Sequence, residues 1–299
     1  MCRRGPAKGL VEPRLGARAH LIEPGGGPLP GRQRELPPGE DPALLVRLLE
    51  GRQRQRLAQP ALGAVAGDLA SAREIRAAAA ALLQACPRID VLIHNAGLWP
   101  SRLERNEDGL EHAFVVNHLA PFLLNHLLEA RLVEGQSRVV QVSAGLYVKG
   151  RPDPARTPTG EDFHPLGTYP TTKLCNLLLV PRFADRWRAL GVTSNAVHPG
   201  VIRTGLGDRG GVLGYLLRAV KRLWKSPEEG ARPVVRLALD PALAGVTGKY
   251  FHLEEEAPLQ PVARDEALAA RLWRQARELS GLGLEERRTE AEGPEAAAR

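Results

Sequence analysis

Apolar runs and helical periodicity alternate along the chain between residues 62 and 283. The apolar runs lack the polar–apolar alternation of a half-exposed strand, which predicts strands buried on both faces. Strands are expected at 89–94, 138–143 and 192–198, and helices at 72–86, 108–132 and 169–190. Strands alternating with helices are typical of a parallel sheet with helices on both faces. The pattern therefore predicts an α/β, doubly wound parallel sheet.

A further helix and strand are expected towards the C-terminus. Ser226 is an N-cap residue, Pro227 suits the first helical position, and Glu229 completes a capping box with Ser226. This helix is expected to end near Leu239, where an Asp-Pro pair follows. A last short strand is predicted at 248–251.

The first 61 residues differ in composition from the rest of the chain. Residues 1–60 contain nine glycines, nine prolines and no aromatic residue. Glycine and proline at this density interrupt any regular period. We therefore predict an atypical Gly/Pro/Arg-rich region at 1–61 that is partly disordered, one domain at 62–283, and a polar, disordered tail at 284–299.

The formal net charge of +7 does not indicate nucleic-acid binding. Only six of the 41 basic residues are lysines, and the arginines are spread along the chain among acidic residues. A nucleic-acid-binding face would show clustered basic residues with aromatic residues between them. No nucleic-acid partner is expected.

No transmembrane segment is expected either. The sequence contains no uninterrupted apolar stretch approaching the 18 or so residues that a membrane-spanning helix needs. The basic N-terminus is not followed by an apolar run of signal-peptide length. These observations predict a cytoplasmic protein.

The strongest candidate chemistry lies in Ser143, Tyr169 and Lys173. Ser143 ends a predicted buried strand, at the sheet edge where α/β folds bind ligands. Tyr169 and Lys173 are four residues apart, so they share one helix face. A nearby ammonium favours the phenolate and lowers the pKa of tyrosine from about 10, as acid–base catalysis near neutral pH requires. A serine hydroxyl can donate to a carbonyl oxygen that gains negative charge.

The Tyr-x3-Lys spacing alone is weak evidence for a site, because it can arise by chance. The motifs around these residues make a chance pairing less plausible. The Asn95–Gly97 turn follows a buried strand, where small residues let a ligand approach the backbone. Asn117 is a poor helix former inside a predicted helix, with an amide available for a polar relay. Pro199 and Gly200 follow the third strand, and Thr204 lies four residues further on. Each feature alone has an ordinary structural explanation, but their order along the chain favours a site.

Taken together, these segments resemble the short-chain dehydrogenase/reductase family, in the branch that contains the retinol dehydrogenases and related dehydrogenase/reductase members. The resemblance covers about residues 62–283. The wide separation of Ser143 and Tyr169 along the chain also resembles the separation of these two residues in the retinol dehydrogenase branch. The resemblance is carried by Gly67-Asp-Leu-Ala-Ser71, Asp90-Val-Leu-Ile-His-Asn-Ala-Gly97, Val116-Asn-His118, Val139-Val-Gln-Val-Ser143, Tyr169-Pro-Thr-Thr-Lys173 and His198-Pro-Gly200 with Thr204.

The resemblance implies a Rossmann-like fold and a set of catalytic roles. Tyr169 would be the general acid/base, and Lys173 would lower its pKa and hold the nicotinamide ribose. Ser143 would polarise the substrate carbonyl, and Asn117 would anchor a proton-relay water.

The resemblance also implies an NAD or NADP cofactor. Asp68 would meet the adenine. The remaining cofactor-lining residues implied by the resemblance are Asn95, Ala96, Gly97, Pro199, Gly200 and Thr204, with Tyr169 and Lys173 contributing as well.

The N-terminal region departs from the family. The family opens with a strand and a Thr-Gly-x3-Gly-x-Gly turn that holds the pyrophosphate, and this chain has no such motif. The glycines at 25–31 are interrupted by prolines and precede no helix, so we interpret them as a loop. In the family's strand order, 3-2-1-4-5-6-7, the missing strand is central and would leave a gap of about 9–10 Å. Either another segment fills this position, or a wrong start site or reading frame upstream of about residue 62 explains the break in composition.

Two smaller departures concern single residues. His94 stands where the family usually has asparagine. Pro170 follows Tyr169 directly, which predicts that Tyr169 lies at or near the helix N-cap, because proline is tolerated in the first turn of a helix.

Two functions from different classes are consistent with this sequence. The first is an oxidoreductase that transfers a hydride between NAD(P) and a small carbonyl or alcohol substrate. The alternative is a non-catalytic remnant or binding protein with a defective cofactor site. Leu98, Trp99 and residues 206–224 could form an apolar lid over a lipophilic substrate, although an ordinary amphipathic surface helix explains the last segment equally well.

Overall fold

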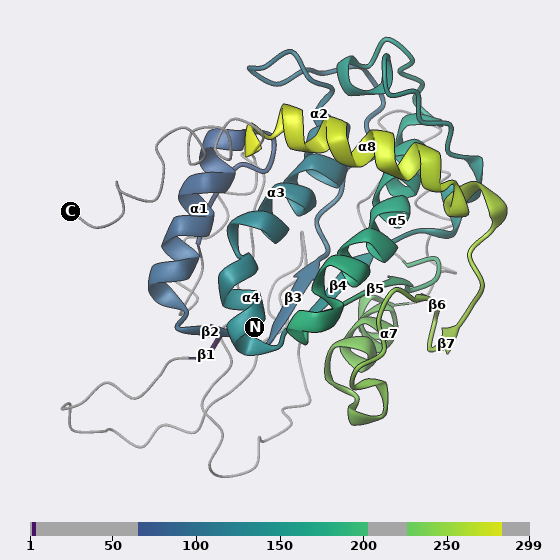
Figure 1. The fold of residues 1–299 in the computed structure, drawn as a ribbon. Helices are drawn as coiled ribbons and strands as arrows, with labels where there is room; N and C mark the ends of the chain where they lie inside the picture. Colours follow the sequence, from purple (N-terminus) through teal and green to yellow (C-terminus); the bar gives the residue numbers. More distant parts are fainter. Residues whose placement is uncertain (1, 4–64, 203–225, 283–299) are drawn as a thin grey trace, which may run out of the picture.

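The computed structural model describes residues 2–3, 65–202 and 226–282, and a five-stranded sheet forms its centre (Figure 1). The strand order is β3-β4-β5-β6-β7. The first four strands are parallel, and β7 pairs antiparallel with β6. The strands are β3 (Val91–His94), β4 (Arg138–Val142), β5 (Thr193–His198), β6 (Tyr250–His252) and β7 (Glu255–Glu256).

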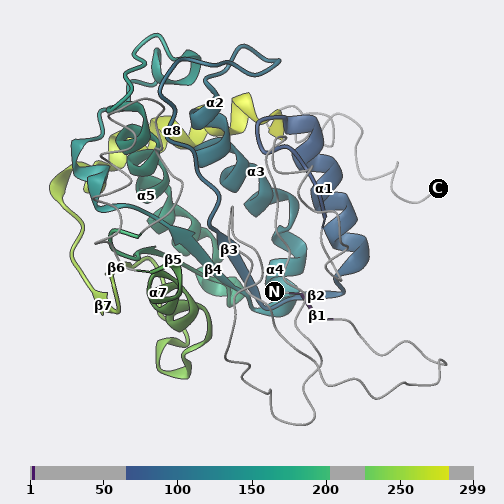
Figure 2. The same cartoon turned by 180° about the vertical axis from the view of Figure 1, so that it is seen from behind.

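Helices cover both faces of this sheet, as the views from the two sides show (Figures 1 and 2). Helices α1, α3, α5 and α8 lie on one face, and α7 lies on the other. The α-helices are α1 (Ala72–Ala85), α2 (His112–Phe114), α3 (Ala120–Leu127), α4 (Glu129–Gly135), α5 (Thr168–Trp187), α7 (Pro227–Leu239) and α8 (Glu266–Leu279). Short 3₁₀ turns occur at Gly145–Lys149, Thr157–Thr159, Arg188–Leu190, Pro241–Leu243 and Pro261–Arg264. The predicted doubly wound α/β architecture is confirmed.

The two hydrophobic cores follow from the alternation of side chains along each strand. Successive strand residues point to opposite faces. Val139 accordingly joins the larger core beneath α1, α3, α5 and α8, whereas its neighbour Val140 packs in the smaller core with Leu237 and Ala238 of α7. The central strands β3, β4 and β5 are largely buried because each face of the sheet is covered.

The predicted helix at 108–132 is divided in the structure. After α2, the backbone forms a π-helical turn at Val115–Leu119 before α3 begins, and α4 follows as a separate helix. The π turn contains Asn117, and single π turns within helices often occur at functional sites. Helical periodicity alone does not separate these segments, because each of them buries apolar residues.

The other predicted elements agree with the structure to within a few residues. Ser226 caps α7, its capping box with Glu229 is formed, and the helix ends at Leu239. The predicted strand at 89–94 is broken at Asp90 into β2 (Arg88–Ile89) and β3. Helix α8 was not among the predicted elements.

The described N-terminal residues form a separate small sheet. Strand β1 (Cys2–Arg3) pairs antiparallel with β2. In the parts of the chain that the structure describes, β3 pairs with β4 only, and the order β3-β4-β5-β6 is the one expected for strands four to seven of the resembled family. The expected gap at the family's first strand, the loop at 25–31 and the tail at 284–299 lie outside the described residues.

Among residues 65–202 and 226–282, no helix combines the length and the apolar character needed to cross a membrane.

Candidate active site

The candidate residues gather at one edge of the sheet. Asn95–Gly97 follows β3, Ser143 follows β4, and residues 199–200 follow β5. Because β3, β4 and β5 are parallel, these three segments leave the sheet at the same edge. Helix α5 carries Tyr169 and Lys173, and it contacts β5.

Tyr169 lies in the first turn of α5, as the proline after it predicts. The helix begins at Thr168 with Gly167 at the N-cap, so Tyr169 is its second residue and Pro170 its third. Proline has no backbone N–H, and this costs the helix no hydrogen bond at Pro170, because the first N–H groups of a helix have no partner within the helix. The Lys173 Nζ lies 5.7 Å from the centroid of the Tyr169 ring.

Lys173 is held between the end of β4 and the turn after β3. Its side chain is buried, and its Nζ donates a hydrogen bond to the Val142 carbonyl at 3.0 Å. Burial lowers the pKa of Lys173 to about 8. A Cβ at Gly97 would lie 3.4 Å from this Nζ and 3.5 Å from Asn117 Oδ1. The absence of a side chain at Gly97 therefore leaves room directly beside the ammonium group.

The pKa of Tyr169 differs from the expectation. Burial raises the pKa of Tyr169 to about 12, and Tyr169 is only 5% exposed. The lowering of the Tyr169 pKa that the sequence predicts from Lys173 does not offset this effect of burial. In this arrangement the loss of water around the phenol outweighs the effect of the neighbouring charge, so the tyrosine is held in its neutral, proton-donating form.

Ser143 presents a buried hydroxyl without a hydrogen-bond partner in the described part of the chain. Its Oγ is inaccessible to water, and no described donor or acceptor contacts it. The residue directly follows Val142, whose carbonyl accepts the hydrogen bond from Lys173. Buried polar atoms are nearly always paired, so an unpaired hydroxyl beside a buried lysine fits a group that contacts a ligand.

Asn117 joins the turn after β3 to helix α5. Its Oδ1 accepts a hydrogen bond from the Leu98 N–H at 2.7 Å. Its Nδ2 donates to the Leu98 carbonyl and to Thr172 Oγ1, both at 2.9 Å. The sequence predicts that the Asn117 side-chain amide is available for a polar relay, but both of its N–H groups already donate hydrogen bonds within the protein. The backbone carbonyl of Asn117 accepts a hydrogen bond from Asn176 Nδ2 at 2.5 Å.

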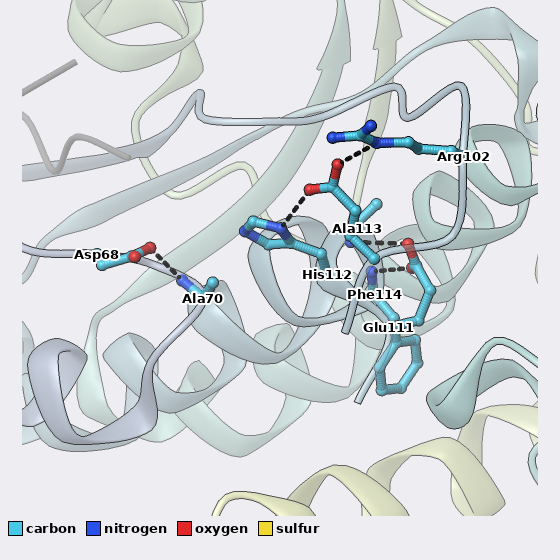
Figure 3. Close-up of polar contacts among 8 residues, drawn as sticks. Asp68, Ala70, Arg102, Glu111, His112, Ala113 and Phe114 are labelled. Carbon is cyan, nitrogen blue, oxygen red and sulfur yellow. Dashed lines mark hydrogen bonds and ion pairs between the residues drawn. The ribbon is translucent and has the colours of Figure 1, made fainter. Parts of the chain in front are cut away.

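Asp68 and Glu111 show how carboxylates cap the nearby backbone (Figure 3). Asp68 Oδ1 accepts from the Ala70 N–H at 2.9 Å. Glu111 is 1% exposed and caps α2, accepting from the N–H groups of Ala113 at 3.0 Å and Phe114 at 2.6 Å. Burial raises the pKa of Glu111. Glu111 thus fixes the start of the segment that leads to the π turn.

The remaining candidate residues have no described contact with Tyr169, Lys173 or Ser143. Asn95 is exposed and Ala96 is partly buried against the larger core. Gly200 adopts a left-handed backbone with φ of 92°, which favours glycine at this turn. Thr204 and the possible lid at 206–224 lie outside the described residues. The structure thus brings together Gly97, Asn117 and Lys173, with Tyr169 and Ser143 beside them.

The sequence indicates that Trp99 could belong to an apolar lid, but it does not predict that its ring lies on Tyr169. The two rings are stacked, with centroids 4.7 Å apart and 7° between their planes. The signal in the sequence was that the first aromatic residue of the chain lies two positions after the Asn-Ala-Gly turn. Among the described residues, no group of three His, Cys, Asp or Glu side chains could hold a metal ion.

Comparison with known proteins gives consistent matches. The family model described as enoyl-(acyl carrier protein) reductase matches residues 47–255. The chain is 40% identical over 212 residues to retinol dehydrogenase 14 of Mus musculus, covering 69% of this chain and 63% of that protein. It is 38% identical over 224 residues to retinol dehydrogenase 13 of Homo sapiens, covering 72% of this chain and 67% of that protein.

The fold matches solved structures at lower sequence identity. The blue fluorescent protein from a metagenomic library, in complex with NADPH, superposes with a TM-score of 0.55 at 22% identity, covering 71% of this chain and 87% of that chain. This likeness supports the Rossmann-like fold. The family-model match and the two relatives above show that the chain belongs to the short-chain dehydrogenase/reductase family, in its retinol dehydrogenase-like branch.

Proposed function

We propose that this protein is an NAD(P)-dependent oxidoreductase that interconverts a carbonyl and an alcohol. The observation that carries the proposal is the arrangement of Ser143, Tyr169 and Lys173 at the carboxyl edge of a parallel sheet. The matches to retinol dehydrogenases 14 and 13 support it. The chain spans 63% of the length of mouse retinol dehydrogenase 14.

The side chains divide the chemistry between them. The Tyr169 hydroxyl is neutral at physiological pH, since burial raises its pKa to about 12, and can give its proton to a carbonyl oxygen during reduction. The unpaired Ser143 hydroxyl can donate to the same oxygen as negative charge develops on it. The Lys173 ammonium favours the phenolate that remains, because an opposite charge nearby stabilises it.

Several residues fit a nicotinamide cofactor at this edge. The Lys173 ammonium, which lies beside Gly97, would donate to the ribose hydroxyls. Residues 95–97 and 199–200 would line the remainder. The dinucleotide, when bound, supplies or accepts the hydride. The NADPH named in the complex of the metagenomic protein supports NAD or NADP here.

We propose a lipophilic carbonyl or alcohol as the substrate class. The two relatives described above are named retinol dehydrogenases. In this chain the partly buried Leu98 and Trp99 present apolar surface directly after the Asn95–Gly97 turn. An apolar wall beside Tyr169 would favour a substrate with apolar surface near its carbonyl.

Tyr169→Phe tests the proposed function. Turnover of a medium-chain or retinoid aldehyde with NADPH or NADH should fall about 10²–10⁴-fold, the usual contribution of general acid–base catalysis. Tyr147→Phe is the matched control, because the Tyr147 hydroxyl accepts a hydrogen bond from the Gln260 N–H at 3.1 Å and belongs to none of the proposed catalytic contacts. Turnover by Tyr169→Phe equal to that of the control would overturn the proposal.

The alternative function is a binding protein with a defective cofactor site. The absence of a Thr-Gly-x3-Gly-x-Gly turn from the sequence favours it, because that turn supplies the donors to the pyrophosphate. Losing two or three charge-assisted hydrogen bonds of about 1.5–3 kcal/mol each would weaken affinity by roughly three orders of magnitude or more. Calorimetric titration with NADPH and NADH distinguishes the two functions: micromolar affinity supports the enzyme, and very weak binding supports the alternative.

A further inference from the structure

Trp99 has a fixed position on the face of Tyr169. The nearly parallel rings, with 7° between their planes and centroids 4.7 Å apart, form the offset stack that aromatic pairs prefer. Trp99 follows the turn after β3, whereas Tyr169 lies in the first turn of α5. The stack therefore joins two elements that both contribute to the proposed active site.

The indole is also tied to the segment that leads into α5. Trp99 Nε1 donates a hydrogen bond to the Pro165 carbonyl at 2.8 Å. Pro165 lies in a turn that the backbone closes, since the Thr168 N–H donates to the His164 carbonyl at 3.0 Å. The His164 N–H in turn donates to Thr168 Oγ1 at 3.1 Å. The acceptor for the indole is thereby held at a set distance from the start of the helix that carries Tyr169.

The backbone before Trp99 is equally constrained. Both polar groups of Leu98 are bonded to the buried Asn117 side chain, at 2.7 Å and 2.9 Å. Pro100 follows Trp99 and restricts its backbone to extended conformations. Trp99 is therefore fixed at its backbone and at its indole N–H, so the ring has little freedom to leave the Tyr169 face.

We infer that Trp99 is a positioning residue of the proposed active site: its indole holds the Tyr169 ring in one orientation and keeps water from the face of that ring. The inference rests on the proposed function, because it assigns Trp99 a role towards the proton donor. Tyr169 is 5% exposed, and burial is the cause that raises its pKa. An indole lying flat on the phenol accounts for part of that burial. Rotation about the side-chain bonds of Tyr169 would move its hydroxyl, and the stack with Trp99 opposes that rotation.

Trp99→Ala should lower kcat more than it changes KM. A reacting group misplaced by about 1 Å can cost on the order of 10²-fold in rate, so we expect a loss of about 10- to 100-fold in kcat. Trp99→Phe keeps a ring on Tyr169 without the hydrogen bond to Pro165, and it should retain most of the turnover. Trp273→Phe is the matched control, because Trp273 packs against Phe122 and Phe183 instead.

A titration without substrate supplies the second measurement. With the indole removed, water reaches the phenol, and the pKa of Tyr169 should fall towards about 10. Ultraviolet absorbance of tyrosinate should then show one additional tyrosine ionising in Trp99→Ala, compared with wild type. The signal should vanish in the double variant Trp99→Ala/Tyr169→Phe. Thermal unfolding followed by circular dichroism establishes that each variant is folded.

The two measurements separate the inference from the proposed function. Wild-type kcat in Trp99→Ala, or no additional tyrosinate signal, overturns the role of Trp99. Full turnover by Tyr169→Phe overturns the proposed function instead. The tyrosinate titration still decides whether Trp99 shields Tyr169 in that case, because it depends on the folded chain alone.

Discussion

The ammonium of Lys173 donates a hydrogen bond to the carbonyl of Val142, 3.0 Å away at the end of β4. This bond ties helix α5 to the sheet immediately before Ser143. It also holds the positive charge beside the tyrosine ring while burial lowers the pKa of Lys173 to about 8. Lys173 is therefore both a link between two elements and a charge that can be lost close to physiological pH.

Lys173→Met should remove one titration from the pH profile of carbonyl reduction. In wild type, turnover should decrease as pH rises through about 8, because Lys173 loses its proton there and no longer favours the Tyr169 phenolate. The variant should turn over more slowly, and this decrease should be absent. Steady-state rates between pH 6 and 10 measure it. Lys249→Met is the control, since Lys249 is half-exposed and paired with Glu256 at 2.8 Å. A decrease that persists at the same pH in Lys173→Met would contradict the assignment.

Ser143→Ala should separate activity from stability. Turnover should fall about 10²-fold or more, as on losing a donor to a developing oxyanion. The free energy of unfolding should change by less than about 1 kcal/mol, because the buried Ser143 hydroxyl has no described partner to lose.

Ser137→Ala provides the opposite pattern to Ser143→Ala. The Ser137 hydroxyl donates to the Leu132 carbonyl at 2.9 Å and also contacts the Ile89 carbonyl. Its removal should cost about 1–2 kcal/mol in urea unfolding and leave turnover unchanged. If Ser143→Ala instead loses stability with normal turnover, the Ser143 hydroxyl is structural.

Asn117→Ala should destabilise the protein strongly. The variant leaves the Leu98 N–H and carbonyl without the partners they have at 2.7 and 2.9 Å, and Thr172 Oγ1 loses one of its two hydrogen bonds. Unpaired buried polar groups cost about 1–3 kcal/mol each, so we expect a loss of about 3 kcal/mol or more. Asn125→Ala, which removes the contact of 2.8 Å with His94, should cost about 1 kcal/mol. Urea unfolding compares them, and equal losses would show that the amide of Asn117 contributes no more than a single hydrogen bond.

Acid should destabilise the fold through His94 and His118. Burial lowers the pKa of each to about 4, below the value of 6.5 expected in the unfolded chain. The unfolded state therefore binds more protons between these values, and stability is lost as pH falls from about 6.5 towards 4. The loss between pH 7 and 5 should be about 2 kcal/mol for each histidine.

Variants identify the histidines that are responsible. The double variant His94→Asn/His118→Asn should show a smaller decrease in the free energy of unfolding between pH 7 and 5. His164→Asn should behave as wild type, because His164 is exposed. An unchanged pH dependence in the double variant would mean that other groups cause the acid sensitivity.

Local patterns in the sequence determined the strand–helix order, the caps and the edge where the site lies. The capping box of Ser226 and Glu229 and the early position of Tyr169 in α5 depend on a few neighbouring residues, so they could be predicted. The four-residue spacing of Tyr169 and Lys173 likewise fixed their shared face. The division of the predicted helix at 108–132 could not be seen, because the π turn at Val115–Leu119 involves Asn117, whose partner Leu98 is distant in sequence.

The protonation state of the site was decided only by tertiary structure. The sequence shows that Lys173 lies near Tyr169, but it does not show which carbonyl the ammonium contacts. That carbonyl belongs to Val142, at the end of β4. It shows an aromatic residue at Trp99 but not that the indole covers the phenol. The pKa of Tyr169 depends on how much water reaches the ring, and that depends on segments brought together by the sheet. Spacing along the chain specifies which groups can act together, whereas packing across the chain sets their charge.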